Sequence, residues 1–239
     1  MERNKFTAYH PYIVNAGREL KWLPSDTKEL FEKNLDKNYN LLKKYNCLNL
    51  DISYKFNKDG FRANNFSQRE NVLFLGCSYT FGIGLPLKNT FPQIVSDKIG
   101  LECFNLGLPG SSNDTAFRLS YIWIKRLNPK LVILTAPPDI RFELLIHDKG
   151  SNEIESRFVT TLDQLVNTEN EPLWANTDQN GLINQEKNIM AIKYICDSLK
   201  IKFLIFYTDN IYTIDNARDL LHPGIESNKN FANKILEQI

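Results

Sequence analysis

Short, unbroken apolar runs recur along this chain, each bounded by glycine, proline or polar residues. Between them lie longer segments whose apolar residues repeat every three or four positions. A short apolar run predicts a strand buried on both faces, and the longer repeat predicts an amphipathic helix. The predicted strands cover 72–76, 102–106, 131–135 and 201–207. The predicted helices cover 90–100, 113–127, 185–199 and 228–238.

Strands that alternate with helices form parallel βαβ units with right-handed crossovers. We therefore predict an α/β fold, a three-layer, flavodoxin-like sandwich with a parallel sheet, over residues 66–239. Residues 1–65 are predicted to form an N-terminal extension that packs on this core. The polar stretch 142–183 shows no ordered period and is predicted to be an insertion or lid, with a short helix near 161–166.

Helix-start and turn signals organise the predicted extension. Ser25 or Asp26 is expected to cap a helix that follows directly, since both residue types accept hydrogen bonds from free amides at a helix start. Further on, apolar residues alternate over 52–56 and lead into Asn57-Lys58-Asp59-Gly60, which predicts a strand and a tight turn. In the core, Asn113-Asp114 is the expected cap of the second helix.

One predicted strand leads directly into a glycine and a serine. The apolar run that begins at Val72 continues as Gly76-Cys77-Ser78. Glycine permits a sharp bend, and Ser78 then lies just past the carboxyl end of a strand, where open α/β sheets place their ligand crevice. Ser78 is therefore our candidate nucleophile. It requires a base, because a serine hydroxyl alone is a weak nucleophile.

The candidate base is His222, which precedes the last predicted helix and has Asp219 three residues before it. In a parallel sheet, the serine loop and the histidine loop open on the same edge. Asp219 at this spacing accepts a hydrogen bond from one ring nitrogen, which fixes the tautomer and stabilises the imidazolium; the alternative is that it only caps a turn. The thiol of Cys77 is an alternative nucleophile. Neighbouring residues at a strand end point in opposite directions, so we expect Cys77 to face the interior.

Composition excludes several other classes. The chain has 239 residues, of which 42% are hydrophobic, and a formal net charge of +1, so no global charge favours nucleic acid or an anionic membrane. Its four cysteines show no paired metal spacing, and no metal or cofactor is expected. No apolar run approaches the roughly 20 residues that span a bilayer. No apolar segment of a secretory signal follows the N-terminus, so the expected location is cytoplasmic.

Three stretches together resemble the conserved blocks of the SGNH (GDSL-like) hydrolases. Gly76-Cys77-Ser78-Tyr79-Thr80 resembles the N-terminal Gly-Asp-Ser block, and Asp219 to His222, with the proline that follows, resembles the C-terminal Asp-x-x-His block. Between them, the stretch Asn105–Ser111 looks like the second block, which supplies an oxyanion-hole glycine. Two departures stand out: Cys77 replaces the aspartate of the first block, and Pro138 replaces the oxyanion asparagine of the third.

The resemblance implies roles for individual residues. The triad would be Ser78, His222 and Asp219. The oxyanion hole would use the backbone amides of Ser78 and Gly110. Because Pro138 offers no donor, Asn113 is the proposed third donor, and Arg141 is an alternative to it.

The resemblance also implies residues that contact the substrate. An Asn-x-x-Gly-Phe-Arg segment lies upstream of the serine in several similar proteins, so Arg62 is proposed to bind an anionic substrate group. Arg141 is the second proposed substrate-binding residue. For both arginines a structural or surface role is the alternative.

The implied function is a serine esterase or acyl-hydrolase that cleaves a small O-acyl ester, by resemblance one on a carbohydrate, with a lipid or a thioester as alternative substrates. Its partner would be this small-molecule acyl ester or carbohydrate substrate. An acyltransferase with the same site is a close alternative. A non-catalytic binding protein on the same fold is the rival class, motivated by Cys77 and Pro138. A phosphate- or nucleotide-binding protein is disfavoured because the glycines at 76, 82 and 84 do not fit a Walker or dinucleotide spacing. The oligomeric state does not follow from the sequence.

Overall fold

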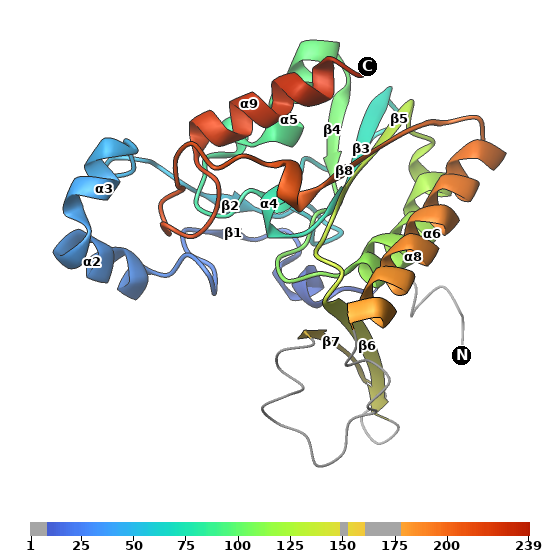
Figure 1. Cartoon of the computed structure of the whole chain (residues 1–239), viewed down its shortest axis with the longest axis horizontal. Helices are drawn as coiled ribbons and strands as arrows, with labels where there is room; N and C mark the ends of the chain where they lie inside the picture. Colours follow the sequence, from blue (N-terminus) through green and yellow to red (C-terminus); the bar gives the residue numbers. More distant parts are fainter. Residues whose placement is uncertain (1–8, 149–152, 161–177) are drawn as a thin grey trace.

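The computed structural model describes residues 9–148, 153–160 and 178–239 (Figure 1). At its centre, four parallel strands lie in the order β4-β3-β5-β8. Their bounds are β3 Asn71–Gly76, β4 Glu102–Asn105, β5 Leu131–Ala136 and β8 Lys202–Tyr207. The order is that of a flavodoxin-like sheet, in which the chain starts inside and the second strand forms one edge.

Helices cover both faces of this sheet (Figure 1). α5 (Phe91–Ile99) and α9 (Ile225–Leu236) pack together on one face. α6 (Asn113–Leu127) and α8 (Asp178–Ser198) pack together on the other. The predicted three-layer α/β sandwich is therefore confirmed. None of the described helices combines the length and the apolar composition that crossing a membrane requires.

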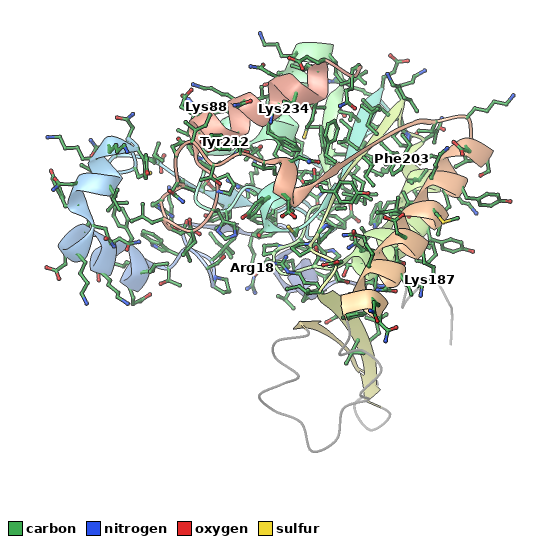
Figure 2. The ribbon with its side chains drawn as sticks, in the orientation of Figure 1. Arg18, Lys88, Lys187, Phe203, Tyr212 and Lys234 are labelled. Atoms are coloured by element: carbon green, nitrogen blue, oxygen red, sulfur yellow. The ribbon has the colours of Figure 1, made fainter. Side chains whose placement is uncertain are left out.

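The core consists of two apolar layers separated by the sheet. Alternate residues of β3 point to opposite layers: Leu73 and Leu75 contribute to one, and Val72 and Phe74 to the other. Because both faces are covered, every residue of β3 is buried, which explains the unbroken apolar run in the sequence. The labelled lysines of Figure 2 are exposed and lie at the periphery, on both helical layers.

Two helix caps differ from the prediction by one or two residues. α2 (Lys28–Lys37) is capped by Thr27, whose hydroxyl accepts from the amide of Leu30 at 3.0 Å. α6 is capped by Ser112, which forms a capping box with Thr115. The cap predictions for Asp26 and Asn113 were wrong, because both side chains make tertiary contacts described below.

The N-terminal extension packs on the sheet domain through its own apolar cluster. Its elements are η1 Pro11–Asn15, β1 Glu19–Leu20, α2, α3 Tyr39–Lys44 and β2 Tyr54–Lys55. β1 and β2 pair antiparallel. The strand predicted over 52–56 is therefore shorter than expected, because β2 covers only Tyr54–Lys55. The turn after it is held by Asn57, whose side-chain oxygen Oδ1 accepts from the backbone amides of Asp59 and Phe61. Ile52, Tyr54 and Phe56 then pack against Phe81 and Ile83 of the serine loop.

The predicted insertion contains an antiparallel hairpin of β6 (Arg141–Asp148) and β7 (Glu153–Thr160). The short helix expected near 161–166 lies outside the described residues, as does the centre of the predicted lid. α8 begins at Asp178, before the predicted start at Gln185. Its first turns lack an apolar repeat because they pack through polar contacts. The side-chain amide of Asn184, for example, donates to Oδ1 of Asp114 at 2.8 Å.

Candidate active site

Ser78 begins a short helix directly after the central strand β3. α4 covers Ser78–Phe81, and the bend before it depends on Gly76, at φ +152°. A Cβ at Gly76 would lie 2.2 Å from Oγ1 of Thr80 and 2.7 Å from the carbonyl of Thr135, so no larger residue fits. The hydroxyl of Ser78 makes no hydrogen bond with any residue that the structure describes, and the side chain is not sealed off from solvent. It is available to a substrate.

Asp219 and His222 form the hydrogen-bonded pair that the sequence predicts. Nδ1 of His222 lies 2.5 Å from Oδ2 of Asp219, and the other carboxylate oxygen accepts from the amides of Leu221 and His222. The Asp219 side chain is fully buried, whereas that of His222 is 15% exposed. Donation from Nδ1–H to the carboxylate leaves Nε2 with its lone pair, the tautomer that a general base requires.

The loop that carries this pair is closed on itself. The amide of Ala217 donates to the carbonyl of His222 at 2.8 Å, and Leu220 adopts the left-handed conformation with φ +59°. A non-glycine residue in that conformation is uncommon and costs on the order of 1 kcal/mol or more. The strained position lies between the carboxylate and the imidazole, in a loop whose contacts over-determine its shape.

The histidine loop packs against the serine loop. The ring of His222 meets the ring of Tyr79 edge-on, with centroids 5.6 Å apart, and Tyr79 is the residue next to Ser78. The amide of Arg218 donates to the carbonyl of Gly84 at 3.2 Å. The two loops therefore meet at one edge of the sheet. No hydrogen bond joins Ser78 to His222 within the described residues, and the Ser78–His222 pair stays a prediction. In unliganded enzymes such bonds are often long.

The candidate oxyanion donors lie at the ends of neighbouring strands. The amide of Ser78 is the first of α4, where helix geometry leaves it without an intrahelical acceptor. Gly110 is exposed with φ +77°, and its turn is held by Ser111, whose hydroxyl donates to the carbonyl of Gly76 at 3.0 Å. Asn113 is buried, and one of its two amide hydrogens is used by the carbonyl of Pro137 at 2.9 Å. Their joint action on an oxyanion stays a prediction.

The loop after β5, where the resembling family has its asparagine, is held from both neighbouring helices. The carbonyl of Pro137 accepts from Asn113 of α6 and, at 2.8 Å, from the side-chain amide of Gln185 in α8. Sequence reasoning missed Gln185, because it appeared only as the start of a helix. Pro138 offers no donor here, as expected.

For Arg62, the contacts favour the structural role, and its predicted role in substrate binding stays untested. Its guanidinium is buried and donates to four backbone carbonyls, those of Ser53, Phe81, Gly82 and Leu85, at 2.5–3.2 Å. Burial lowers the pKa of Arg62 to about 10, so it stays charged at neutral pH. The guanidinium therefore joins the end of α4 and the chain that follows it to Ser53 of the N-terminal extension, and it satisfies backbone acceptors that are buried there.

Arg141, the second predicted substrate-binding residue, lies at the edge of the sheet where the parallel strands end, shortly after β5. Its amide donates to the carbonyl of Pro138 at 3.2 Å, and its side chain lines a cavity of about 210 Å³. Tyr79 also lines this cavity, as does the buried thiol of Cys77. Cys77 is thus buried as predicted, and it is one of the residues that line the cavity.

A buried polar network from the N-terminal extension reaches the histidine loop, and sequence reasoning missed it. Asp26 forms an ion pair with Arg218 and accepts a hydrogen bond from the hydroxyl of Tyr54. That hydroxyl in turn accepts from the amide of Gly84 at 2.9 Å. The side-chain amide of Asn34 donates to the carbonyl of Asp219 at 3.4 Å. No local pattern marks these partners, because each lies far away in the sequence.

A larger hollow of about 510 Å³ lies along the edge strand β4. Its charged residues include Arg69 and Glu102, which pair with each other at 3.4 Å. It contains none of the candidate catalytic residues. Among the described residues, no cluster of three or more histidine, cysteine or carboxylate side chains suits a metal ion.

No family model and no curated protein matches this chain. The structure is similar to several solved structures of low sequence identity. One is TesA, with 9% identity over 70% of this chain and 97% of that chain, at a TM-score of 0.48. Another is a carbohydrate acetylesterase family member from Sinorhizobium meliloti, with 14% identity, coverage of 71% and 98%, and a TM-score of 0.36.

A third similar structure is the psychrotrophic esterase EstA from Pseudoalteromonas sp., with 14% identity, coverage of 70% and 95%, and a TM-score of 0.37. At these identities and TM-scores the likeness carries no argument about chemistry. The function therefore has to be argued from the residues of this chain.

Proposed function

We propose that this protein is an SGNH-type serine ester hydrolase. Ser78 is the nucleophile, His222 the general base and then acid, and Asp219 the residue that orients the imidazole. The observation that carries the proposal is the Asp219–His222 hydrogen bond of 2.5 Å in a loop whose histidine ring contacts the neighbour of Ser78. A surface histidine would need neither a buried carboxylate nor an enforced tautomer.

The proposed reaction has two steps. Oγ of Ser78 attacks the ester carbonyl carbon while its proton passes to Nε2 of His222. The tetrahedral intermediate collapses, the bond between carbonyl carbon and alcohol oxygen breaks, and the alcohol leaves with the proton from His222. Water then attacks the acyl-serine by the same route and releases the acid. The substrate class, by resemblance, is a small O-acyl ester such as one on a carbohydrate.

The negative charge of each tetrahedral intermediate needs donors. The backbone amides of Ser78 and Gly110 are the proposed pair, and the second amide hydrogen of Asn113 is the proposed third donor. Each such donor is worth about 2.7–4 kcal/mol of barrier in hydrolases of this kind. With Pro138 in place of an asparagine, Asn113 occupies a different element, α6, and is held by the carbonyl next to that proline.

The test is the turnover of 4-nitrophenyl acetate by the purified wild type and by Ser78→Ala, together with labelling by a fluorophosphonate. We expect Ser78→Ala to lower kcat at least about a thousandfold and to abolish labelling. Cys77→Ala should still be labelled, because the adduct forms on Ser78. Equal turnover by the wild type and Ser78→Ala would remove the mechanism, and labelling lost only in Cys77→Ala would transfer it to the thiol.

A non-catalytic binding protein is the second candidate. The observation that favours it is the loop after β5, where proline replaces a donor and the nearby Asn113 amide is already engaged. If this alternative holds, the purified protein should be folded but should neither turn over 4-nitrophenyl acetate nor be labelled by the fluorophosphonate. If the protein is an acyltransferase, we expect the fluorophosphonate to label it, and we expect an added alcohol to speed the release of the acyl group from Ser78.

A further inference from the structure

The cavity beside Ser78 lies between the carboxyl ends of three strands. Cys77 follows β3, Arg141 follows β5, and Thr208 and Asp209 follow β8 in the short helix η4 (Thr208–Asn210). Tyr79 completes the wall on the side of the His222 ring. At about 210 Å³ the cavity is smaller than a typical drug-sized pocket and suits one compact chemical group.

The guanidinium of Arg141 in this wall has no hydrogen-bond or ion-pair partner among the residues that the structure describes. Its Nη1 is buried away from solvent. Arg141 itself is half-buried, whereas the fully buried arginines of the described residues are all engaged: Arg62 by carbonyls, Arg118 by Glu143, and Arg218 by Asp26. A buried charged donor without an acceptor is costly, and native structures rarely retain one without a reason.

The neighbours of Arg141 favour an anion as the missing acceptor. Burial raises the pKa of the Tyr79 phenol, so at neutral pH it is a hydroxyl donor. Thr208, a second residue with a hydroxyl group, also lines this cavity. Asp209 is the one acidic residue of the lining, and its side chain is exposed, where water screens its charge. A guanidinium with adjacent hydroxyls matches the geometry of carboxylate and phosphate oxygens.

We propose that this cavity binds a compact oxyanion group of the substrate, a carboxylate or phosphate, through Arg141, and that it makes the enzyme selective for acidic esters. The identification of the bound anion as part of a substrate rests on the proposed function. Anion binding by the cavity itself depends only on its lining by Arg141, Tyr79 and Thr208.

The test compares charged and neutral esters of matched size. On the acyl side the pair is mono-4-nitrophenyl succinate and 4-nitrophenyl butyrate. On the alcohol side it is 4-acetoxybenzoate and phenyl acetate. Within each pair, the ratio of kcat/KM for the charged ester to that for the neutral ester is measured in the wild type and in variants, so that intrinsic reactivity cancels.

We expect Arg141→Gln to lower this ratio about 10- to 100-fold for at least one pair, mainly through KM. Arg141→Lys should recover part of the loss because it keeps the charge. Asp209→Asn is the matched control, because it removes a negative charge from the lining instead of a positive one, and it should raise the ratio. A ratio unchanged in Arg141→Gln for both pairs would overturn the proposal. An equal loss on charged and neutral esters would also overturn it, because Arg141 would then act on the oxyanion instead.

A binding measurement separates this proposal from the failure of catalysis. Titration of the wild type and Arg141→Gln with inorganic phosphate and with succinate, followed by calorimetry, needs no turnover. If no ester is hydrolysed but the wild type binds either anion and Arg141→Gln does not, the cavity stands and the hydrolase proposal falls. If the wild type binds neither anion and shows no preference for charged esters, the cavity proposal falls whatever the turnover.

Discussion

Arg218 and Asp26 form a buried ion pair across 192 positions of the chain: Nη2 of Arg218 lies 2.7 Å from Oδ2 of Asp26, and Nε lies 3.1 Å from Oδ1. Arg218 directly precedes Asp219, and its guanidinium also lies 4.0 Å from the ring centroid of Trp22. The N-terminal extension therefore holds the loop that carries the candidate acid and base. The extension is part of the site's framework, although no hydrogen bond joins its described residues to the hydroxyl of Ser78.

Asp26→Ala should destabilise the protein strongly, because it leaves the Arg218 guanidinium buried without its counter-ion. Breaking one partner of a buried pair costs about 3–5 kcal/mol. Urea unfolding measures this loss. The residual activity of the folded fraction, at temperatures well below the unfolding transition, should also fall, because the Asp219–His222 loop loses its anchor.

The matched control is Asp51→Ala, which removes an exposed ion pair with Lys21 in the same extension. Exposed pairs contribute about 0–1 kcal/mol, so this variant should be nearly as stable as the wild type. Equal stability losses in the two variants would contradict the anchoring role of Asp26.

Gly84→Ala tests the contact between the two loops. Gly84 has φ +70°, and a Cβ there would lie 2.9 Å from Cβ of Ala217 and 3.0 Å from the amide nitrogen of Arg218. Gly100 has φ +71°, and a Cβ there would meet nothing within 4 Å. Both substitutions carry the cost of a side chain in the left-handed region, about 1–2 kcal/mol.

Gly84→Ala should therefore lower both stability and kcat more than Gly100→Ala, because it alone pushes the histidine loop away from the serine loop. Thermal unfolding and turnover of 4-nitrophenyl acetate measure the two effects. A kcat that is equally reduced in both variants would show that backbone strain, and not the loop contact, is responsible.

Asp219→Asn should lower kcat by roughly 10⁴-fold with little change in KM, since an asparagine amide donates to Nδ1 and forces the proton onto Nε2. His222 would then hold the wrong tautomer for a base. Glu226→Gln, on the exposed first turn of α9, is the charge control and should leave turnover within about twofold. Turnover by Asp219→Asn close to that of the wild type would reduce Asp219 to a turn-capping residue.

His10 should make the protein less stable in mild acid. Burial lowers the pKa of His10 to about 4, and its ring donates to the carbonyl of Asp59 at 2.8 Å. Since the folded-state value lies below the unfolded value of about 6.5, the unfolded chain binds the proton more tightly. The stabilisation from neutral His10 is complete above pH 6.5 and is lost as the pH falls toward 4, on the order of 3 kcal/mol.

Urea unfolding of the wild type and His10→Gln at pH 7 and pH 4.5 measures this contribution. Both proteins lose stability through their carboxylates, so the difference between them isolates His10. The wild type should lose more on acidification than His10→Gln. An identical loss would show that the imidazole does not titrate in this range.

Local pattern predicted the sheet domain well, because the two central strands, β3 and β5, are buried on both faces and therefore carry unbroken apolar runs. The Asp219–His222 contact was predictable for a similar reason: three residues of spacing bring the two side chains together in one loop. The caps of α2 and α6 were missed because Asp26 and Asn113 use their polar groups on partners far away in the chain.

By itself, the sequence determined the order of strands and helices, the position of Ser78 after β3, and the pairing of Asp219 with His222. These depend on periodicity and short spacings, which act within a few residues. Only the tertiary structure decided that Arg62 serves the backbone, that Asp26 holds Arg218, and that Arg141 has no partner in the described part of the chain. The chemistry of an arginine depends on which acceptors the folded chain places around it, and those acceptors come from segments that no local pattern connects.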